Sequence, residues 1–496
     1  MVESKSQVDN DDSSTAPVGR LPTQGDSTQL ESLGFHSELQ RTFSLPSIVG
    51  LCLCLMSTWE ACAAVLVQGL ASGGAPCLFY NFQLSIISFS GSLAIGASLG
   101  EIASIYPTAG GQYHWVTALA PARFRKPAGW VTGWISIGGL IALTSSPAFL
   151  GGLMTQGLIT LNSDSYIGTR WQGMLLYWTF VFYAAAMNVW GHRALPTANL
   201  ISGVLHGLFF LVTLIVLAAM SKKNTAHFVF AEAQNETGWS SSGVAWFVGM
   251  ISSVYPLLGY DAACHLAEEL PHASRNVPIA IIGSISINGI LGLAFTLVLL
   301  FSSGPLENLL QSPTGFPFIQ LYLDATKSHV GTTILTIFII MMALAGAVAG
   351  LTSTSRTLWA FARDDATPFS NFLSTMKRNE QVPTRAIWTI TALQILLGFI
   401  YLGSSTAFNA ILSMAIIGMY LSYVLPILAM LLGGRSRLAK ADYGPFKLSY
   451  TFGTFLNFCN ASFGTEYELF KCRDCGMPIV SAGVVTGIPL AAVEYC

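Results

Sequence analysis

Long apolar runs alternate with short polar stretches over most of the chain. Each run holds about 20 residues or more, which is the length that an α-helix needs to cross a bilayer. The runs are continuous rather than alternating, so they predict helices and not the strands of a membrane β-barrel. We expect ten spanning helices, at residues 46–70, 78–104, 129–158, 170–190, 198–220, 243–270, 278–303, 330–361, 386–403 and 407–433.

Both ends of the chain depart from this pattern. Residues 1–42 are rich in Ser, Asp, Gln and Thr and lack hydrophobic periodicity, which predicts a disordered tail with no signal peptide. Residues 434–496 carry polar residues at short intervals, and their apolar stretches 451–463 and 478–493 are too short or too weak for a clear span. We therefore expect a ten-helix core over 43–433, followed by an atypical C-terminal region.

The composition agrees with a membrane setting. The chain is 52% hydrophobic and only 10% charged, whereas soluble domains carry about 25% charged residues. Ten of the 48 charged residues lie within the first 45 positions, so the remainder cannot cover a soluble surface. A soluble enzyme, a nucleic-acid binder and a disordered protein are excluded as main interpretations. An all-α, multi-pass membrane protein with the lipid bilayer around it fits instead.

The positions of Lys and Arg predict the orientation. With the N-terminus in the cytoplasm, thirteen of these residues fall in inner loops or after the tenth helix, and four fall in outer loops. This is the bias of the positive-inside rule. The same topology places the sequon Asn235-Glu236-Thr237 outside, so Asn235 is a candidate glycosylation site.

The first and sixth apolar segments are interrupted in a similar way. Ser57-Thr58-Trp59-Glu60 forms a polar group in the middle of the first, and Pro256, Gly259 and Asp261 interrupt the sixth. These segments occupy corresponding places in two five-helix halves, and paired interruptions of this kind indicate a transporter's central site. A broken helix frees backbone N–H and C=O groups, which must then meet protein, water or ligand.

Two carboxylates lie at these interruptions. A charge at the membrane centre costs about 2.5–3.5 kcal/mol, so Glu60 and Asp261 need a physical reason. Either carboxylate could bind a cationic group or carry a coupling proton; the alternative is pairing with a helix terminus or a place nearer the interface. The neighbouring Trp59 and Tyr260 could hold an ammonium by cation–π contact or could simply pack in the bundle.

Further acidic residues lie near the cytoplasmic ends of the segments. Glu268 and Glu269 end the sixth segment near Arg275 and Arg363, which suggests either a gate of charge pairs or a solvated helix end. Glu101, near the inner end of the second segment, has the same two interpretations.

Histidines and cysteines offer little catalytic chemistry. His114 and His265 lie near the membrane and could relay protons or play a structural role. Cys472 and Cys475 form one C-x-x-C without a second pair, so no metal site is expected. No nucleophile arrangement or phosphate loop stands out, and we expect neither an enzyme nor a cofactor.

Several long motifs resemble the amino acid–polyamine–organocation superfamily, and within it the fungal GABA/choline-type permeases. The resemblance covers about residues 40–448, and its motifs are Ser57–Ala61, Gly69–Gly74, Glu101–Trp115, Leu119–Pro121, Gly259–Asp261, His265–Glu269, Arg275–Pro278, Thr354–Asp364 and Val382–Thr384. It implies a leucine-transporter-type 5+5 inverted repeat with broken first and sixth helices. It also implies alternating access and proton- or gradient-coupled uptake of an amino acid, GABA or a choline-like amine, most naturally at the plasma membrane.

The resemblance also implies roles for residues. The substrate site would be lined by Met56, Ser57, Thr58, Trp59, Glu60, Gly259, Tyr260 and Asp261. Freed amides after the first break would take a substrate carboxylate, while Asp261 or the aromatic residues would take the amine. Gating or coupling would involve Glu101, His114, Glu268 and Glu269.

Two other interpretations stay open. The chain could be a substrate sensor built on a permease fold, which binds without transport, although its N-terminal extension is only about 42 residues long. It could also be the inactive product of a damaged or mis-spliced gene. Permeases of this superfamily usually continue to twelve spans, whereas here the eleventh and twelfth helices look missing or degenerate.

Overall fold

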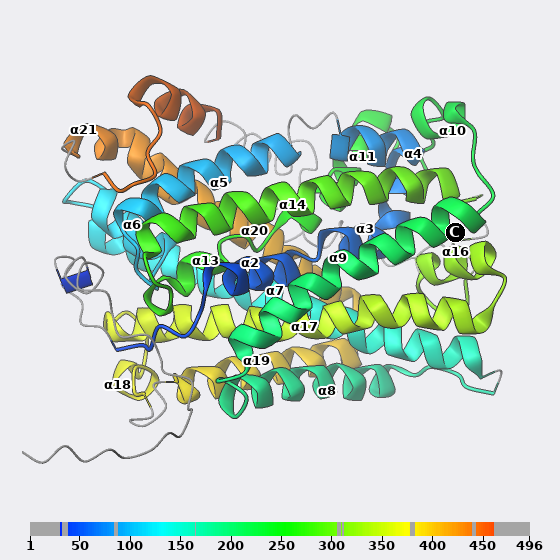
Figure 1. The fold of residues 1–496 in the computed structure, drawn as a ribbon, viewed down its shortest axis with the longest axis horizontal. Coiled ribbons are helices and arrows are strands. Elements are labelled where there is room, and N and C mark those ends of the chain that lie inside the picture. Colours follow the sequence, from blue (N-terminus) through cyan, green and yellow to red (C-terminus); the bar gives the residue numbers. More distant parts are fainter. Residues whose placement is uncertain are drawn as a thin grey trace, which may run out of the picture.

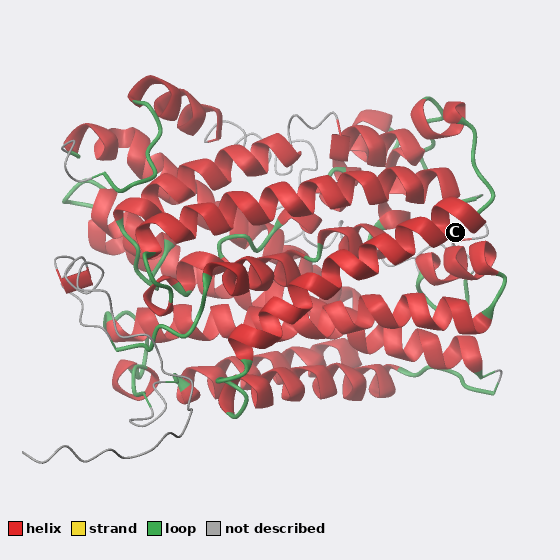
Figure 2. Cartoon of the chain, viewed as in Figure 1, coloured by secondary structure: helices red, strands yellow, loops and turns green. Residues whose placement is uncertain are grey.

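The protein is a bundle of helices that run along one common axis (Figure 1). The computed structural model describes residues 30–31, 38–83, 88–163, 165–304, 309, 312–376, 382–438 and 443–460. Within these ranges every regular element is a helix and none is a strand (Figure 2). The all-α prediction is confirmed.

Long helices build the bundle, and short ones join them at its two ends. The long helices are α5 (Ser88–Ile105), α7 (Arg125–Asn162), α8 (Arg170–Val189), α9 (Leu195–Met220), α14 (Ala273–Ser302), α17 (His329–Arg363), α19 (Thr384–Gly403) and α20 (Ser405–Ala429). The short connecting helices are α6 (Gln112–Leu119), α10 (Ala226–Phe230), α16 (Pro317–Thr326), α18 (Ser370–Leu373), the π-helical turn η3 (Met430–Gly434) and α21 (Arg435–Arg437).

The first and sixth segments are divided into pieces. The first consists of α2 (Leu45–Met56) and α3 (Thr58–Ala64), with α4 (Leu66–Gln83) after them. The sixth consists of α11 (Ser242–Gly249), α12 (Ile251–Val254), η1 (Tyr255–Leu257), α13 (Ala262–His265) and η2 (Ala267–Glu269). Both expected interruptions are therefore helix breaks in the structure.

Eight segments of the described chain are long and apolar enough to cross a membrane, and they make this an integral multi-pass membrane protein. They are Leu45–Ala64, Arg125–Asn162, Leu195–Met220, Ser242–His265, Ala273–Ser302, His329–Arg363, Thr384–Gly403 and Met414–Arg437. The other two expected segments coincide with α5 and α8, which pack in the same bundle against α14 and α7.

One expected boundary differs from the structure. Residues 78–83 belong to α4, and the second spanning helix, α5, begins only at Ser88. The apolar run around Cys77 extends α4 past a kink at Gly73 and Gly74, where Gly74 has a φ of 73°. Hydropathy alone does not show that residues 78–83 belong to α4 rather than to α5, because the chain is apolar on both sides of the kink.

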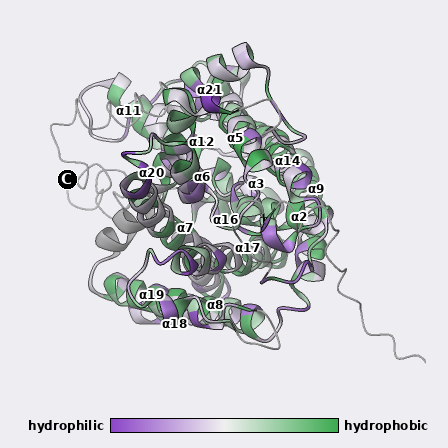
Figure 3. Cartoon of the chain, turned by 90° about the vertical axis from the view of Figure 1, so that its left-hand side faces the viewer, coloured by the Kyte–Doolittle hydropathy of each residue, from purple (hydrophilic) through white to green (hydrophobic). Residues whose placement is uncertain are grey.

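The bundle has two distinguishable ends. We call the left-hand end of Figure 1, which carries α6, α13, α18 and α21, the basic end, because most of the loop Arg and Lys residues lie there. The opposite end carries α4, α10, α11 and α16. Figure 3 looks along the bundle from the basic end.

The helices divide into central and peripheral ones. In Leu45–Ala64, 83% of the most apolar window is buried inside the protein, whereas in Leu195–Met220 only 28% is. On α9 the side chains of Val204, Leu208 and Ile215 are exposed, as expected of a surface that faces lipid rather than water. The broken first segment therefore lies in the protein interior.

Close backbone contact brings α9 against the first segment. A Cβ on Gly203 would lie 2.9 Å from the Cα of Gly50, and a Cβ on Gly50 would lie 2.3 Å from the backbone oxygen of Asn199. Small residues allow such close helix crossings in membranes. The crossing positions α9 beside α3, where the buried chemistry described below is found.

The C-terminal part of the described chain packs on α5. The backbone N–H of Leu448 donates to Glu101, and a helix over 450–460 follows, where Asn460 Nδ2 donates to Ser98 Oγ at 3.0 Å. At about 1.5 Å per residue, the described part of this helix is about 16 Å long. The expectations for 1–29, 32–37 and 461–496 fall outside the described residues.

Candidate functional site

The two helix breaks lie next to each other in the middle of the bundle. Ser57 has a left-handed backbone with a φ of 39°, which ends α2 and lets α3 start in a new direction. Gly259 has a φ of 99°, a conformation that glycine adopts without strain. The Thr58 hydroxyl donates to the backbone oxygen of Pro256 at 2.6 Å, so one hydrogen bond joins the two breaks.

A cavity opens at the first break. Its volume is about 40 Å³, whereas one water needs about 10–15 Å³. Of the expected substrate residues, Met56, Ser57 and Glu60 line it; the other lining residues are Leu55, Ala61, Ala64, Leu143, Pro147, Leu150, Met154, Tyr255, Leu258, Ile339 and Ala343. The cavity is therefore mostly apolar, and Glu60 is the acidic side chain in its wall.

Glu60 is paired with a histidine from α9. Its Oε1 lies 2.9 Å from His206 Nδ1, and the two side chains are only 4% and 1% exposed. The other carboxylate oxygen, Oε2, is buried and has no hydrogen-bond partner. A carboxylate oxygen in this state can accept a hydrogen bond from a cationic ligand in the cavity.

Trp59 and Thr58 support the break rather than line the cavity. Trp59 is fully buried, and its ring centroid lies 5.1 Å from that of Phe295 and 6.2 Å from those of Phe210 and His206. This aromatic packing holds the start of α3 against α9 and α14, while the Thr58 hydroxyl is committed to Pro256.

Asp261 lies apart from the cavity wall and is fully buried among donors. Its Oδ1 accepts from the Tyr423 hydroxyl at 2.6 Å, and its Oδ2 accepts from Gln112 Nε2 at 2.7 Å. His265 Nε2 lies 3.3 Å from the same Oδ2. Asp261 thus joins the broken sixth segment to α6 and α20.

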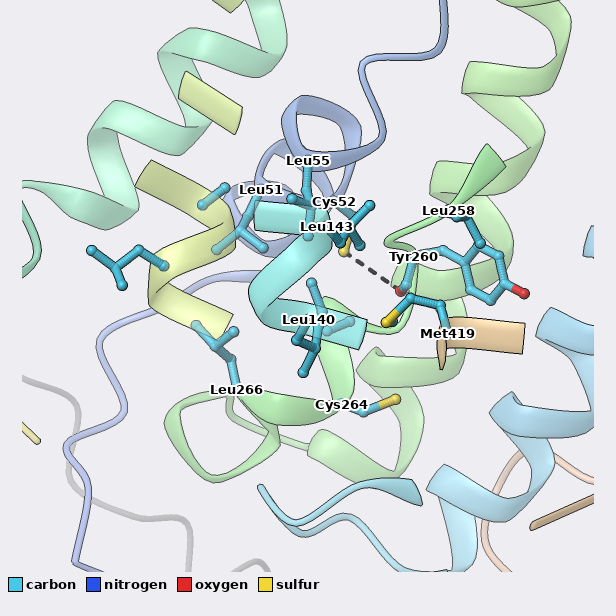
Figure 4. Close-up of a cluster of buried hydrophobic side chains, with 14 of the residues drawn as sticks. Leu51, Cys52, Leu55, Leu140, Leu143, Leu258, Tyr260, Cys264, Leu266 and Met419 are labelled. Atoms are coloured by element: carbon cyan, nitrogen blue, oxygen red, sulfur yellow. Dashed lines mark hydrogen bonds between the residues drawn. The ribbon is translucent and has the colours of Figure 1, made fainter. Parts of the chain in front are cut away.

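Gly259 and Tyr260 form part of the packed region on the basic side of the cavity. Figure 4 shows Tyr260 and Leu258 among buried side chains of α2, α7 and α20, with the thiol of Cys52 donating to the Tyr260 backbone oxygen at 3.8 Å. The rings of Tyr260 and Tyr423 have centroids 5.0 Å apart. The packing of Tyr260 against α2 and α20 therefore stabilises the sixth-segment break.

Glu268 joins three elements at the basic end. Its carboxylate accepts from Arg363 Nη1 at 2.9 Å and from Arg363 Nη2 at 3.0 Å, and it also accepts from the backbone N–H of Ala109 at 3.0 Å. The pair is largely excluded from solvent, with 1% exposure for Glu268 and 13% for Arg363. Of the two interpretations of Glu268 drawn from the sequence, the structure shows charge pairing.

Two further buried ion pairs lie at the same end. Glu269 accepts from Arg356 Nε at 2.8 Å, and Glu101 pairs with the guanidinium of Arg435. We call Glu268–Arg363, Glu269–Arg356 and Glu101–Arg435 the basic-end ion pairs. Together they tie η2 to α17 and α5 to α21, so these helices are held together at this end.

His114 lies on α6 beside these pairs, in the wall of a surface groove of about 550 Å³ that Asp364 also lines. Burial, followed by the charge of Arg363, lowers the pKa of its imidazole to about 4. Although this groove is larger than the cavity at the first break, it opens on the basic-end surface. At the opposite end, Asn235 is exposed, and its amide donates to the Trp239 backbone oxygen at 2.9 Å.

Five partner residues escaped prediction from sequence: His206, Arg356, Gln112, Tyr423 and Arg435. The position of Arg356 in the sequence already indicates a buried acidic partner, because a cation inside an otherwise apolar segment requires one. His206 also lies inside an apolar segment, and its position indicates a buried partner less strongly. Gln112, Tyr423 and Arg435 are unremarkable in sequence, and only the tertiary fold places them against carboxylates.

The buried Arg–Glu ion pairs described above lie at one end of the molecule. The basic-end ion pairs and the bonds of Asp261 lie on one side of the breaks. The cavity continues from the break along α3 and α7, where Ala61, Ala64 and Leu150 are partly exposed. Because α3 lies farther from the basic end than α2 (Figure 1), the part of the cavity that Ala61 and Ala64 line lies toward the opposite end.

Comparisons with known proteins agree with this arrangement. Residues 43–463 match the family model described as amino acid permease. A Macrophomina phaseolina protein, whose name assigns it to amino acid/polyamine transporters, is 33% identical over 81% of this chain and 88% of its own. The choline transporter of Saccharomyces cerevisiae is 32% identical over 84% and 73%, and an amino-acid permease of Arabidopsis thaliana is 29% identical over 85% and 83%. The chain belongs to the amino acid permease family of the amino acid–polyamine–organocation superfamily.

Proposed function

We propose that the protein is a secondary active transporter that imports a small amine or amino acid by alternating access, coupled to protons. One observation carries the proposal: Glu60, a buried carboxylate whose Oε2 has no hydrogen-bond partner, lines a cavity at the paired helix breaks. The names of two relatives, a choline transporter and an amino-acid permease, describe substrates that share an amine or ammonium group.

The substrate's cationic group would contact Glu60. An ammonium donates to a carboxylate, and such charge-assisted hydrogen bonds are about twice as strong as neutral ones. A carboxylate on the same substrate would accept from the first backbone N–H groups of α3, which begins at Thr58 and carries the partial positive charge of a helix N-terminus. The apolar remainder of the wall, including Leu143 and Pro147, would contact the carbon chain.

Alternating access would require the basic-end ion pairs to separate. In the present conformation the basic-end ion pairs are formed, while the cavity extends toward the opposite end. If the basic end faces the cytoplasm, as the loop charges suggest, this is a state that takes substrate from outside. Glu101, Glu268 and Glu269 would then act in gating, and Asp261 would couple the sixth-segment break to α6 and α20. The same orientation would place a glycosylated Asn235 on the external side, and we place the protein in the plasma membrane as part of this proposal.

Uptake of labelled substrates tests the proposal. A transport-deficient host that expresses the protein is given GABA, choline, and neutral and basic amino acids at two external pH values. We expect saturable accumulation of at least one of them, with faster uptake at the lower pH for a proton-coupled substrate. Binding without accumulation would instead identify a sensor. Retention inside the cell until a twelve-span C-terminus is grafted on would identify a damaged product.

A further inference from the structure

The Glu60–His206 pair is left incomplete on both sides. Glu60 Oε1 and His206 Nδ1 are 2.9 Å apart, yet Glu60 Oε2 and His206 Nε2 are both buried without a hydrogen-bond partner. Buried polar atoms are nearly always satisfied, because leaving one unpaired costs about 1–3 kcal/mol. Each of the two unpaired atoms can therefore take a further partner, such as a ligand or a proton.

The chemistry of the pair assigns a different partner to each atom. Next to an ionised Glu60, Nδ1 of a neutral His206 carries the hydrogen, so that Nε2 holds the free lone pair. A lone pair on imidazole is the site that accepts a proton near neutral pH. Glu60 lines the cavity, and its unpartnered Oε2 can accept from a ligand there, whereas His206 Nε2 can take up a proton.

Few other groups could titrate at this place. The groups that experience the charge of Glu60 are the thiols of Cys54 on α2 and Cys62 on α3, and the phenol of Tyr322 on α16. Thiols and phenols ordinarily stay neutral at pH 5–7. The described helices α14 and α17, which also pack on α9, have no charged side chain over 276–302 or 330–355. His206 is therefore the basic group that faces Glu60.

We propose that His206 is the proton-binding residue that couples the proton gradient to transport, a role that rests on the proposed function. The pair with neutral His206 carries one negative charge, and the proton on Nε2 makes it neutral. A zwitterionic substrate adds no net charge, so it binds together with the proton. A simple cation would leave a buried net positive charge, which is unfavourable, so it displaces the proton to water instead.

This charge balance makes the two substrate classes respond differently to pH. Binding of a quaternary ammonium such as choline competes with the proton, so its apparent affinity rises from pH 5.5 to 7.5. The apparent affinity for a zwitterion such as GABA does not fall when the pH is lowered from 7.5 to 5.5. Equal pH responses of the two ligands, measured on the unmodified purified protein, would overturn the assignment without any variant.

A variant test uses proteoliposomes. For one proton per substrate and with the membrane potential held at zero, a gradient of one pH unit sustains at most about tenfold accumulation of GABA. We expect His206→Gln to lose this accumulation and to equilibrate GABA only, while it still exchanges labelled for unlabelled GABA across the membrane without a gradient. The matched control His192→Gln changes a partly exposed histidine that contacts only the Val189 backbone oxygen among the bonds described, and it should accumulate GABA as the unmodified protein does.

The outcomes separate the two proposals. Gradient-driven accumulation by His206→Gln at the control level overturns the role of His206 and leaves the transport function standing. Neither exchange nor accumulation of any tested substrate by the unmodified protein overturns the transport function itself. If His206→Gln is not recovered as a monodisperse protein, His206→Asn, whose amide can also donate to Glu60, takes its place in the same assay.

Discussion

Removing the charge of Glu268 should open the basic end of the protein. Glu268 receives two hydrogen bonds from Arg363 and one from the Ala109 backbone, and it is 1% exposed. Deleting one partner of a buried ion pair costs about 3–5 kcal/mol. The glutamine of Glu268→Gln keeps one acceptor oxygen, and Arg363 touches solvent, so we expect the closed state to lose only about 2–3 kcal/mol of stability. This loss shifts the closed–open equilibrium about 30- to 150-fold.

Thiol labelling measures this shift directly. Cys264 on α13 is 1% exposed and lies four residues before Glu268, so a reagent reaches it only when this region opens. In a variant whose other cysteines are replaced, Glu268→Gln should speed labelling by a membrane-impermeant reagent, applied from the basic-end side, by about the same factor. The matched control Asp324→Asn removes an acid from an exposed pair with Lys327 and should leave the rate unchanged. A Glu268→Gln rate within twofold of the control would refute the gating role.

Three further substitutions have separate readouts. Asp261→Asn should abolish saturable uptake at unchanged surface expression, because an amide cannot accept at both positions that face Tyr423 and Gln112; unchanged uptake kinetics would refute this. His114→Gln should weaken the loss of thermal stability as pH falls from about 6.5 to 4. The pKa of this histidine is about 4 in the folded protein and about 6.5 in the unfolded chain, so the unfolded state binds more protons in that window; an equal pH slope in melting experiments would contradict it. Gly203→Val should reduce the yield of monodisperse protein, since its Cβ would meet Gly50 at 2.9 Å, and an unchanged size-exclusion profile would argue against the tight α2–α9 crossing.

The sequence predicted the fold class and both helix breaks because these depend on local composition. Apolar runs of spanning length give membrane helices, and Ser57 and Gly259 interrupt two of them with backbone conformations that end a helix. The expected start of the second span at residue 78 is too early, because the apolar residues that follow the kink at Gly74 still belong to α4 and hydropathy does not separate them from α5.

The site was less predictable because its contacts join distant parts of the chain. Glu60 and Asp261 looked equivalent in sequence, as carboxylates at two matching breaks. In the fold, Asp261 is surrounded by three polar partners, whereas Glu60 lines the cavity and has one histidine partner and one oxygen without a partner. That difference arises from where α6, α9 and α20 pack, and the crossing of Gly50 and Gly203 that brings His206 to Glu60 involves positions 153 residues apart.

Saturable uptake by Glu60→Gln is the most direct test of the account. The substitution keeps the shape of the side chain and removes the charge that we propose to bind the substrate's cationic group. In proteoliposomes that hold matched amounts of protein, we predict that the unmodified protein accumulates its amine or amino acid substrate. Glu60→Gln should lose at least about 10-fold in apparent affinity, because hydrogen bonds to a charged group contribute about 1.5–3 kcal/mol. Uptake by Glu60→Gln with the same affinity and maximal rate as the unmodified protein would contradict the account.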